Sequence, residues 1–127
     1  MTLSSSPVGD VGELNASLVI ELPVANLKAS LAFYRQAGFT VERATASFAA
    51  LAWRGAYLFL VRSRGFTPAP RPPNIRLLTQ DLEAAFSQAE ACGWPVRQPP
   101  GDRDYGLRDF TVLDPDGYEL RFATPLG

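Results

Sequence analysis

The sequence contains no histidine in its 127 residues. Histidine is the commonest metal ligand in proteins and the commonest general base near neutral pH. Its absence excludes any catalytic triad that uses histidine and the usual histidine-containing zinc sites. Cysteine is scarce too, because Cys92 stands alone and cannot form an intrachain disulfide. We weigh a small buried side chain against a reactive thiol for Cys92, and favour the first.

The sequence also lacks a long apolar run and an excess of charge of either sign. No stretch is long enough to span a membrane. With 12 basic and 13 acidic residues, no charge imbalance points to nucleic acid or to an anionic membrane as a partner. Residues 1–16 lack the basic start and apolar centre of a signal peptide. We therefore expect a flexible lead there, a cytoplasmic protein, and one globular domain over residues 17–127.

What the chain does contain is an internal repeat, with halves at about 17–62 and 74–125. In the first half we expect a strand at 17–24, a helix at 27–37, and strands at 39–43, 47–53 and 56–62. The second half begins in the same order, with a strand at 74–79 and a helix at 82–92. Asn26 and Asp81 are the helix N-cap candidates, and Gly38 and Gly93 are the helix stops. Each half is thus βαβββ.

The two halves differ in length and are joined by a stiff connector. Asn26 corresponds to Asp81 at an offset of 55 positions, whereas Gly55 corresponds to Gly117 at an offset of 62. The additional residues of the second half fit best in the segment 99–106. The connector, residues 63–73, is rich in proline and suits an extended conformation. A half of about 50 residues buries too little surface to fold alone, so we expect both halves to form one unit.

Strand alternation separates two sheet faces. The more apolar face is expected to pack beneath the helices and comprises Leu18, Ile20, Leu22, Val24, Leu58, Leu60, Ile75, Leu77, Tyr118, Leu120 and Phe122. The opposite face mixes aromatic side chains with charges of both signs, as a ligand cleft does. It comprises Val19, Glu21, Phe48, Tyr57, Phe59, Asn74, Arg76, Asp109, Thr111, Glu119 and Arg121.

Two motifs resemble the glyoxalase/bleomycin-resistance/extradiol dioxygenase superfamily, also called the vicinal oxygen chelate superfamily. Residues 22–34, LPVANLKASLAFY, followed by Gly38-Phe39, are similar to its opening strand and helix, with Asn26 where aspartate is more usual. Residues 114–122, DPDGYELRF, are similar to its closing hairpin, with Tyr118 where asparagine is commoner. The resemblance implies an α+β fold in which two βαβββ repeats form a concave mixed sheet.

A third segment resembles the bleomycin-resistance subgroup within this superfamily. Residues 102–110, DRDYGLRDF, follow its pattern of an aromatic residue, glycine, any residue, arginine, glutamate and phenylalanine. Tyr105 takes the aromatic position, and Asp109 replaces the glutamate. A tyrosine beside a glycine in a mobile loop can stack on a planar ligand. For Arg108 we weigh a ligand contact against a salt bridge to a neighbouring acid, and slightly favour the salt bridge.

In metal-using members, the resemblance implies two ligands from each half. The positions map here to Val19, Phe59, Asn74 and Arg121. Valine and phenylalanine cannot ligate a metal, asparagine is a weak donor and arginine brings a positive charge. A shift of two residues brings in Glu21 and Glu119, a pair suited to magnesium, but Arg76 and Arg121 project to the same face. We expect neither a metal nor another cofactor.

The candidate ligand-binding residues therefore lie on the mixed face and its rim. They are Glu21, Phe48, Phe59, Asn74, Arg76, Tyr105, Asp109 and Arg121. A purely structural alternative stays open, in which Glu21, Glu119, Arg76 and Arg121 pair with one another across the sheet. The aromatic side chains are equally compatible with a core or a dimer interface.

Three functions remain compatible with the sequence. The first is a metal-free protein that binds a small molecule, as in antibiotic or metabolite sequestration. The second is a metal-independent lyase or isomerase in which Glu21, Glu119 or Asp109 moves a proton. The third is a regulatory or assembly module with an empty cleft. Bleomycin is cationic and the mixed face is not markedly acidic, so bleomycin is not the ligand we favour. The resemblance and the open sheet edges predict a homodimer.

We predict that the native protein carries no stoichiometric transition metal, because the mapped positions offer no adequate set of donors. Elemental analysis of protein purified without chelators measures this. Near-stoichiometric zinc, nickel, iron or manganese contradicts the prediction.

Overall fold

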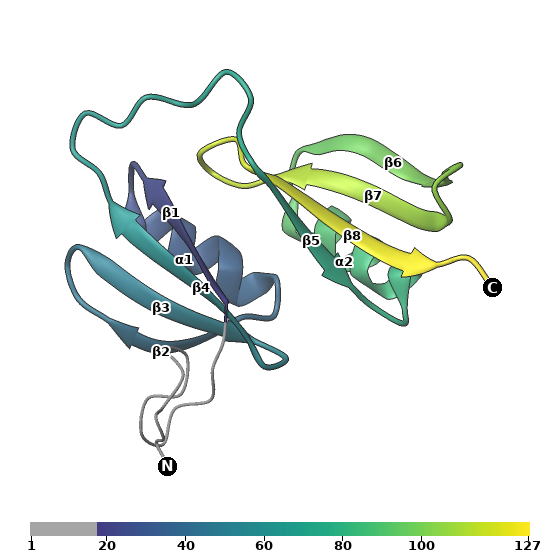
Figure 1. The fold of residues 1–127 in the computed structure, drawn as a ribbon, viewed down its shortest axis with the longest axis horizontal. Coiled ribbons are helices and arrows are strands. Elements are labelled where there is room, and N and C mark those ends of the chain that lie inside the picture. Colours follow the sequence, from purple (N-terminus) through teal and green to yellow (C-terminus); the bar gives the residue numbers. More distant parts are fainter. Residues whose placement is uncertain (1–17) are drawn as a thin grey trace, which may run out of the picture.

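The chain folds into two βαβββ halves that lie side by side (Figure 1). The computed structural model describes residues 18–127, so the lead expected at 1–16 lies outside the described residues, as does Ser17 of the first expected strand. The first half comprises β1 (Val19–Val24), α1 (Leu27–Gln36), β2 (Thr40–Ala44), β3 (Phe48–Trp53) and β4 (Ala56–Arg62). The second comprises β5 (Asn74–Leu78), α2 (Leu82–Cys92), β6 (Val96–Asp102), β7 (Leu107–Leu113) and β8 (Glu119–Pro125).

Each half forms its own four-stranded mixed sheet. The strand order is β1-β4-β3-β2 in the first sheet and β5-β8-β7-β6 in the second. In both, the first strand runs parallel to the last and the remaining pairs are antiparallel. The predicted α+β fold with two βαβββ repeats is confirmed. The strands are divided between two sheets, and β1, β2, β5 and β6 are the edge strands.

Both helices begin at the predicted caps. The Asn26 side chain accepts a hydrogen bond from the backbone N–H of Ala29 at 3.1 Å, and Asp81 accepts from Ala84 at 3.0 Å. These bonds satisfy N–H groups that have no partner within the helix. Gly93 caps α2 in the left-handed conformation, with φ of 71°, as a C-terminal glycine is expected to do. No helix of residues 18–127 has the length and apolar character needed to cross a bilayer.

Within residues 18–127, one hydrophobic core lies on the helix-covered faces of the two sheets and joins the halves. Aromatic contacts cross between them, since the Phe33 and Trp94 rings are 4.7 Å apart. The second half continues this cluster, with Trp94 stacked on Phe122 and Phe122 on Phe110. Cys92 is partly buried and packs against the same core.

Two members of the predicted core are an exception. Leu18 is 84% exposed and Ile20 is 47% exposed, so the expectation that they pack beneath a helix was wrong. Leu18 lies just before the edge strand β1 and Ile20 near its start, whereas Leu22 and Val24 at its other end are buried. Alternation therefore identified the side of the strand correctly, but α1 covers only one end of β1.

Hydrogen bonds join the hairpin between β7 and β8 of the second half to the region of β1 and α1 in the first half. Tyr34 of α1 donates to Asp114 Oδ2 at 2.7 Å, and the Tyr118 hydroxyl donates to the carbonyl oxygen of Pro23 at 2.7 Å. The Asp116 carboxylate accepts from the backbone N–H of Ala25 at 3.3 Å. We call these contacts of Tyr34, Asp114, Asp116 and Tyr118 the clasp.

Within the clasp, the hydrogen bond between Tyr34 and Asp114 is buried, so its loss leaves a polar group unpaired in the core. Tyr34 is fully buried and Asp114 is 5% exposed. Burial raises the pKa of the Asp114 carboxyl, and hydrogen bonds from Tyr34 and from two backbone N–H groups only partly offset this rise. Burial also raises the pKa of the Tyr34 hydroxyl, so this group stays protonated and donates.

We predict that Tyr34→Phe destabilises the protein by about 1–3 kcal/mol, because Asp114 Oδ2 then loses its donor inside the core. Denaturant unfolding measures the change. Tyr57→Phe is the matched control, since Tyr57 is 38% exposed on the sheet surface, and its effect should be within about 0.5 kcal/mol. Equal midpoints for the two variants contradict a stabilising role for the clasp.

Candidate ligand-binding site

The candidate site lies on the sheet faces turned away from the helices, which we call the open faces. The predicted ligand-binding residues fall into two groups on these faces. Glu21, Phe48 and Phe59 belong to the first sheet, and Asn74, Arg76, Asp109 and Arg121 belong to the second, with Tyr105 in the turn between β6 and β7. No hydrogen bond or ion pair between residues 18–127 connects the two groups.

The group on the first sheet is largely apolar. The rings of Phe48 and Phe59 meet edge to face with centroids 5.1 Å apart, and the Arg43 guanidinium lies 5.7 Å from the Phe48 centroid. Glu21 is the β1 partner of Phe59 in the parallel register. It is exposed, and no salt bridge to another described residue involves it. This open face therefore presents aromatic surface beside one carboxylate.

The group on the second sheet is organised by Asp109, which is 1% exposed. Its carboxylate accepts hydrogen bonds from Arg103 Nε at 2.7 Å, the Tyr105 hydroxyl at 2.6 Å and Arg76 Nη1 at 3.2 Å. Burial alone raises the pKa of Asp109, but these hydrogen bonds outweigh burial and hold the pKa below its usual 3.8. Asp109 is thus ionised and fully engaged, so it positions its neighbours and has little capacity left for a ligand.

Asp109 in turn fixes Tyr105 and Arg76. The Tyr105 ring is half exposed, and the Arg76 guanidinium lies 5.6 Å from the ring centroid. Arg103 ties the turn further, because its Nη2 donates to the carbonyl oxygens of Pro99 and Asp109. The Arg103 guanidinium lies directly against Gly101, where a Cβ atom would come within 2.7 Å of Arg103 Nη1. The expected mobile tyrosine is therefore held at its hydroxyl while its ring stays accessible.

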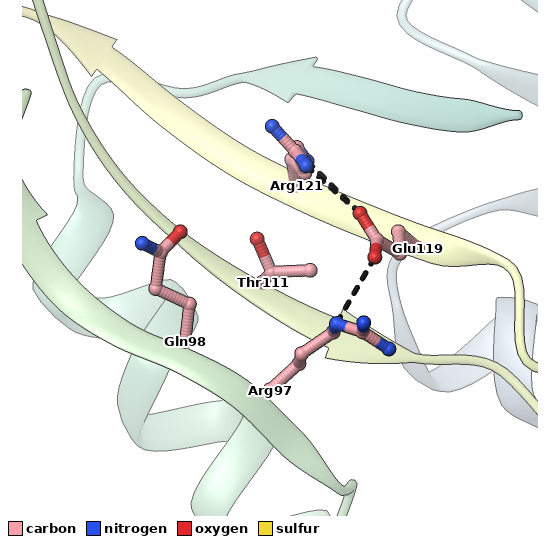
Figure 2. Close-up of a pocket in the computed structure, with 5 residues that line it drawn as sticks. All are labelled: Arg97, Gln98, Thr111, Glu119 and Arg121. Atoms are coloured by element: carbon pink, nitrogen blue, oxygen red, sulfur yellow. Dashed lines mark hydrogen bonds and ion pairs between the residues drawn. The ribbon is translucent and has the colours of Figure 1, made fainter. Parts of the chain in front are cut away.

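A pocket of about 250 Å³ opens beside this network on the same sheet. Figure 2 shows its lining, which comes from β6, β7 and β8 and comprises Arg97, Gln98, Thr111, Glu119 and Arg121. The Glu119 carboxylate is shared by two guanidinium groups, with Arg121 Nη2 at 2.8 Å and Arg97 Nε at 3.1 Å. Thr111 forms part of the floor and is 1% exposed, yet its hydroxyl has no hydrogen-bond partner among residues 18–127.

Sequence reasoning named Arg121 as a ligand-binding residue but missed the remaining residues of this pocket. Thr111 and Glu119 were assigned to the correct face from strand alternation. Arg97 and Gln98 were not, because β6 pairs with β7 in an irregular register, with shifts between Val96 and Gln98 and between Gln98 and Gly101. A bulge changes which side chains face the cleft, and alternation does not predict where it falls.

The expected charge pairing is present in part. Glu119 pairs with Arg121, as the structural alternative predicted, whereas Arg76 pairs with Asp109. The salt-bridge interpretation of Arg108 is confirmed, because it contacts Asp102 at 3.1 Å and Glu83 at 3.3 Å.

The donor set does not fit a metal. The four mapped positions, Val19, Phe59, Asn74 and Arg121, include no carboxylate, imidazole or thiolate. Within residues 18–127 no cluster of three or more histidine, cysteine, aspartate or glutamate side chains is arranged to hold a metal ion. Glu119, two residues from the mapped position Arg121, has both carboxylate oxygens engaged by arginines.

We predict that Asp109→Asn destabilises the protein by about 1–3 kcal/mol at pH 7, because Arg76 and Arg103 lose their charged partner. The folded-state pKa of Asp109 is lowered, so its stabilising contribution is complete above the usual value of 3.8 and is lost as the pH falls through the lowered value. The difference in unfolding free energy between wild type and variant should shrink correspondingly in acid.

Asp104→Asn serves as the control, since Asp104 is exposed in the same turn. Unfolding curves at pH 7 and at several values below 3.8 measure both variants. A destabilisation by Asp109→Asn that stays constant over this whole range contradicts the assignment of an ionised, hydrogen-bonded carboxylate.

Comparison with known proteins agrees with this fold. The sequence model of the Glyoxalase/Bleomycin resistance protein/Dioxygenase superfamily matches residues 17–122. An uncharacterized protein of Mycolicibacterium smegmatis is 33% identical over 109 residues, which cover 85% of this chain and 92% of that protein.

Solved structures share the architecture at low sequence identity. A bleomycin resistance determinant encoded on the transposon Tn5 has a TM-score of 0.74 and 21% identity, over 86% of this chain and 97% of that one. A bleomycin-binding protein complexed with bleomycin has a TM-score of 0.71 and 22% identity, over 85% and 97%. A lactoylglutathione lyase from Agrobacterium tumefaciens has a TM-score of 0.70 and 18% identity, over 86% and 92%. At these identities the likeness shows the fold alone. The match over residues 17–122 shows more, and the chain belongs to the glyoxalase/bleomycin resistance protein/dioxygenase superfamily.

Proposed function

We propose that this protein binds a small organic molecule on its open faces, without a metal and without transforming the ligand. The observation that carries the proposal is the pocket on the second sheet, whose polar lining is already ordered by Glu119 and Arg121. A preorganised polar cluster at the rim of a cleft gives orientation and specificity to a bound molecule. Tyr105 and the Phe48–Phe59 pair add aromatic surface for stacking.

The state of the carboxylates favours binding over proton transfer. A general acid at neutral pH needs a raised pKa, whereas the pKa of Asp109 is lowered by its three donors. Glu119 is held between two arginines, and each of its carboxylate oxygens contacts one of them. Two of the carboxylates considered for the lyase or isomerase alternative, Asp109 and Glu119, are thus already engaged by arginines.

Sequestration of an antibiotic or a metabolite is the role we propose for such binding. Two of the structural neighbours are a bleomycin resistance determinant and a bleomycin-binding protein. The pocket described here contains two arginines and one glutamate, so its charge does not suit a cation such as bleomycin. We therefore propose that this protein binds a small molecule, as the bleomycin-binding neighbour does, but that its ligand is not bleomycin.

A second copy of the chain is part of this proposal. A volume of about 250 Å³ is small for an organic ligand beyond a fragment, and the pocket is open to one side. Leu18, just before the edge strand β1, and Ile20 within it are also exposed, and together with Tyr57 they line an apolar pocket of about 460 Å³ beside β5. Exposed apolar side chains on an open sheet edge are typical of surfaces that pair with another chain.

We predict that Arg121→Ala weakens binding of any ligand found by a thermal-stabilisation screen by about ten- to a hundredfold, through loss of a charged hydrogen bond. The free energy of unfolding should change little, because Glu119 keeps Arg97 as a partner. Arg71→Ala in the connector is the control. Lost stability with unchanged affinity for the ligand contradicts a binding role for Arg121.

We also predict a dimer at micromolar concentration, measured by sedimentation velocity. Ile20→Lys should shift it toward monomer, because the charge replaces an apolar side chain on the β1 edge. Leu126→Lys, at a comparably exposed apolar residue near the C-terminus, is the control. A wild-type protein that sediments only as a monomer contradicts the proposed second copy.

A further inference from the structure

The floor of the second-sheet pocket contains an unused hydrogen-bonding group. Thr111 is 1% exposed, and its Oγ1 makes no hydrogen bond within the part of the chain that the structure describes. Burying a hydroxyl without a partner costs free energy, and such groups in folded proteins call for an explanation. In the sheet register Thr111 lies opposite Gln98 on one side and Arg121 on the other. Figure 2 shows its hydroxyl among the polar groups of the pocket.

The charges around this hydroxyl determine which kind of ligand group can bind beside it. Two guanidinium groups, those of Arg97 and Arg121, surround a single carboxylate, that of Glu119. Arg121 uses Nε and Nη2 on Glu119, and Arg97 approaches it with Nε. No hydrogen bond from Arg121 Nη1, or from the terminal nitrogens of Arg97, to another described residue is present. The pocket thus combines one net positive charge with free N–H donors and a free O–H donor.

We propose that this pocket binds the carboxylate group of a small organic acid, with Thr111 and Arg121 as its donors. The inference rests on the proposed binding function and names its ligand class. A carboxylate accepts hydrogen bonds only, which matches a set of free donors. Hydrogen bonds between guanidinium and carboxylate are among the strongest in proteins.

The first sheet indicates what the rest of the acid is like. By their place in the repeat, the positions of Glu119 and Arg121 correspond to Tyr57 and Phe59, since each pair faces the first strand of its own half in the same register. The open face of the first sheet is therefore aromatic at the positions where the open face of the second sheet is charged. In a dimer, the open face of the first sheet of one copy can lie opposite the open face of the second sheet of the other copy. A cleft between these two faces has an apolar wall on one side and a cationic wall on the other. An acid with an aromatic body, such as benzoate, satisfies both.

Three probes separate the contribution of charge from that of apolar contact. Benzoate carries both the ring and the carboxylate, acetate carries the carboxylate alone, and benzylamine carries the ring with a positive charge. Calorimetric titration should give the highest affinity for benzoate, with benzylamine at least about tenfold weaker. Equal or tighter binding of benzylamine, or no binding of benzoate at millimolar concentration, overturns the inference.

Thr111→Val tests the hydroxyl itself, because valine keeps the shape of threonine. Removing a buried hydroxyl that has no partner should leave the unfolding free energy unchanged or raised, while the affinity for benzoate falls about tenfold. Thr40→Val, at an exposed position of β2, is the control. Unchanged benzoate affinity in Thr111→Val overturns the assignment of this donor.

The outcomes also separate this inference from the proposed function. In one outcome, the protein fails to bind benzoate but binds a neutral or cationic molecule, with an affinity that Arg121→Ala lowers. This result supports the proposed binding function and overturns the carboxylate assignment. Failure of every molecule in the thermal-stabilisation screen, benzoate included, contradicts both.

Discussion

The hydrogen bond from Tyr34 to the buried carboxylate of Asp114 is the contact on which the arrangement of the two halves depends. Each half has an apolar face that one helix covers only in part, so neither is expected to be stable alone. The clasp brings these faces together and lets Phe33 pack on Trp94 across the boundary. It occurs once, because the residue of α2 that corresponds to Tyr34 is Ala89. On that side a groove of about 410 Å³ remains between the helices, bordered by Trp53 and Arg54.

Because the halves meet through their helix-covered faces, the open faces remain available for binding. The two open faces differ in their side chains, although they occupy equivalent places in the repeat. Phe48 and Phe59 form an aromatic pair on the first sheet, whereas the second sheet has salt bridges centred on Asp109 and Glu119. Both carboxylates orient arginines, and this leaves Arg121 and the Thr111 hydroxyl facing the pocket. A molecule with an apolar body and an anionic end is complementary to the two faces together.

Local signals in the sequence were sufficient for the framework of the fold. The caps at Asn26 and Asp81 form as expected, and strand alternation separates the two faces correctly. Two kinds of feature could not be predicted from the sequence. One is how far a helix covers a strand, and the other is where the backbone departs from regular strand geometry. Ile20 has the correct parity for the core but lies beyond the end of the helix cover. Arg97 reaches the pocket only because β6 is irregular, and Arg103 reaches Asp109 across a turn whose path alternation does not describe.

Binding of an organic acid at the open face of the second sheet is the function that we propose for this protein. Titrating isotopically labelled protein with benzoate, while following the arginine Nε–H signals by NMR, tests the location directly. The account predicts that the signals of Arg97 and Arg121 shift together and saturate with one dissociation constant. Arg54, beside the groove between the helices, should not respond. Shifts confined to Arg54, or no change at Arg121 when binding is saturated, contradict it.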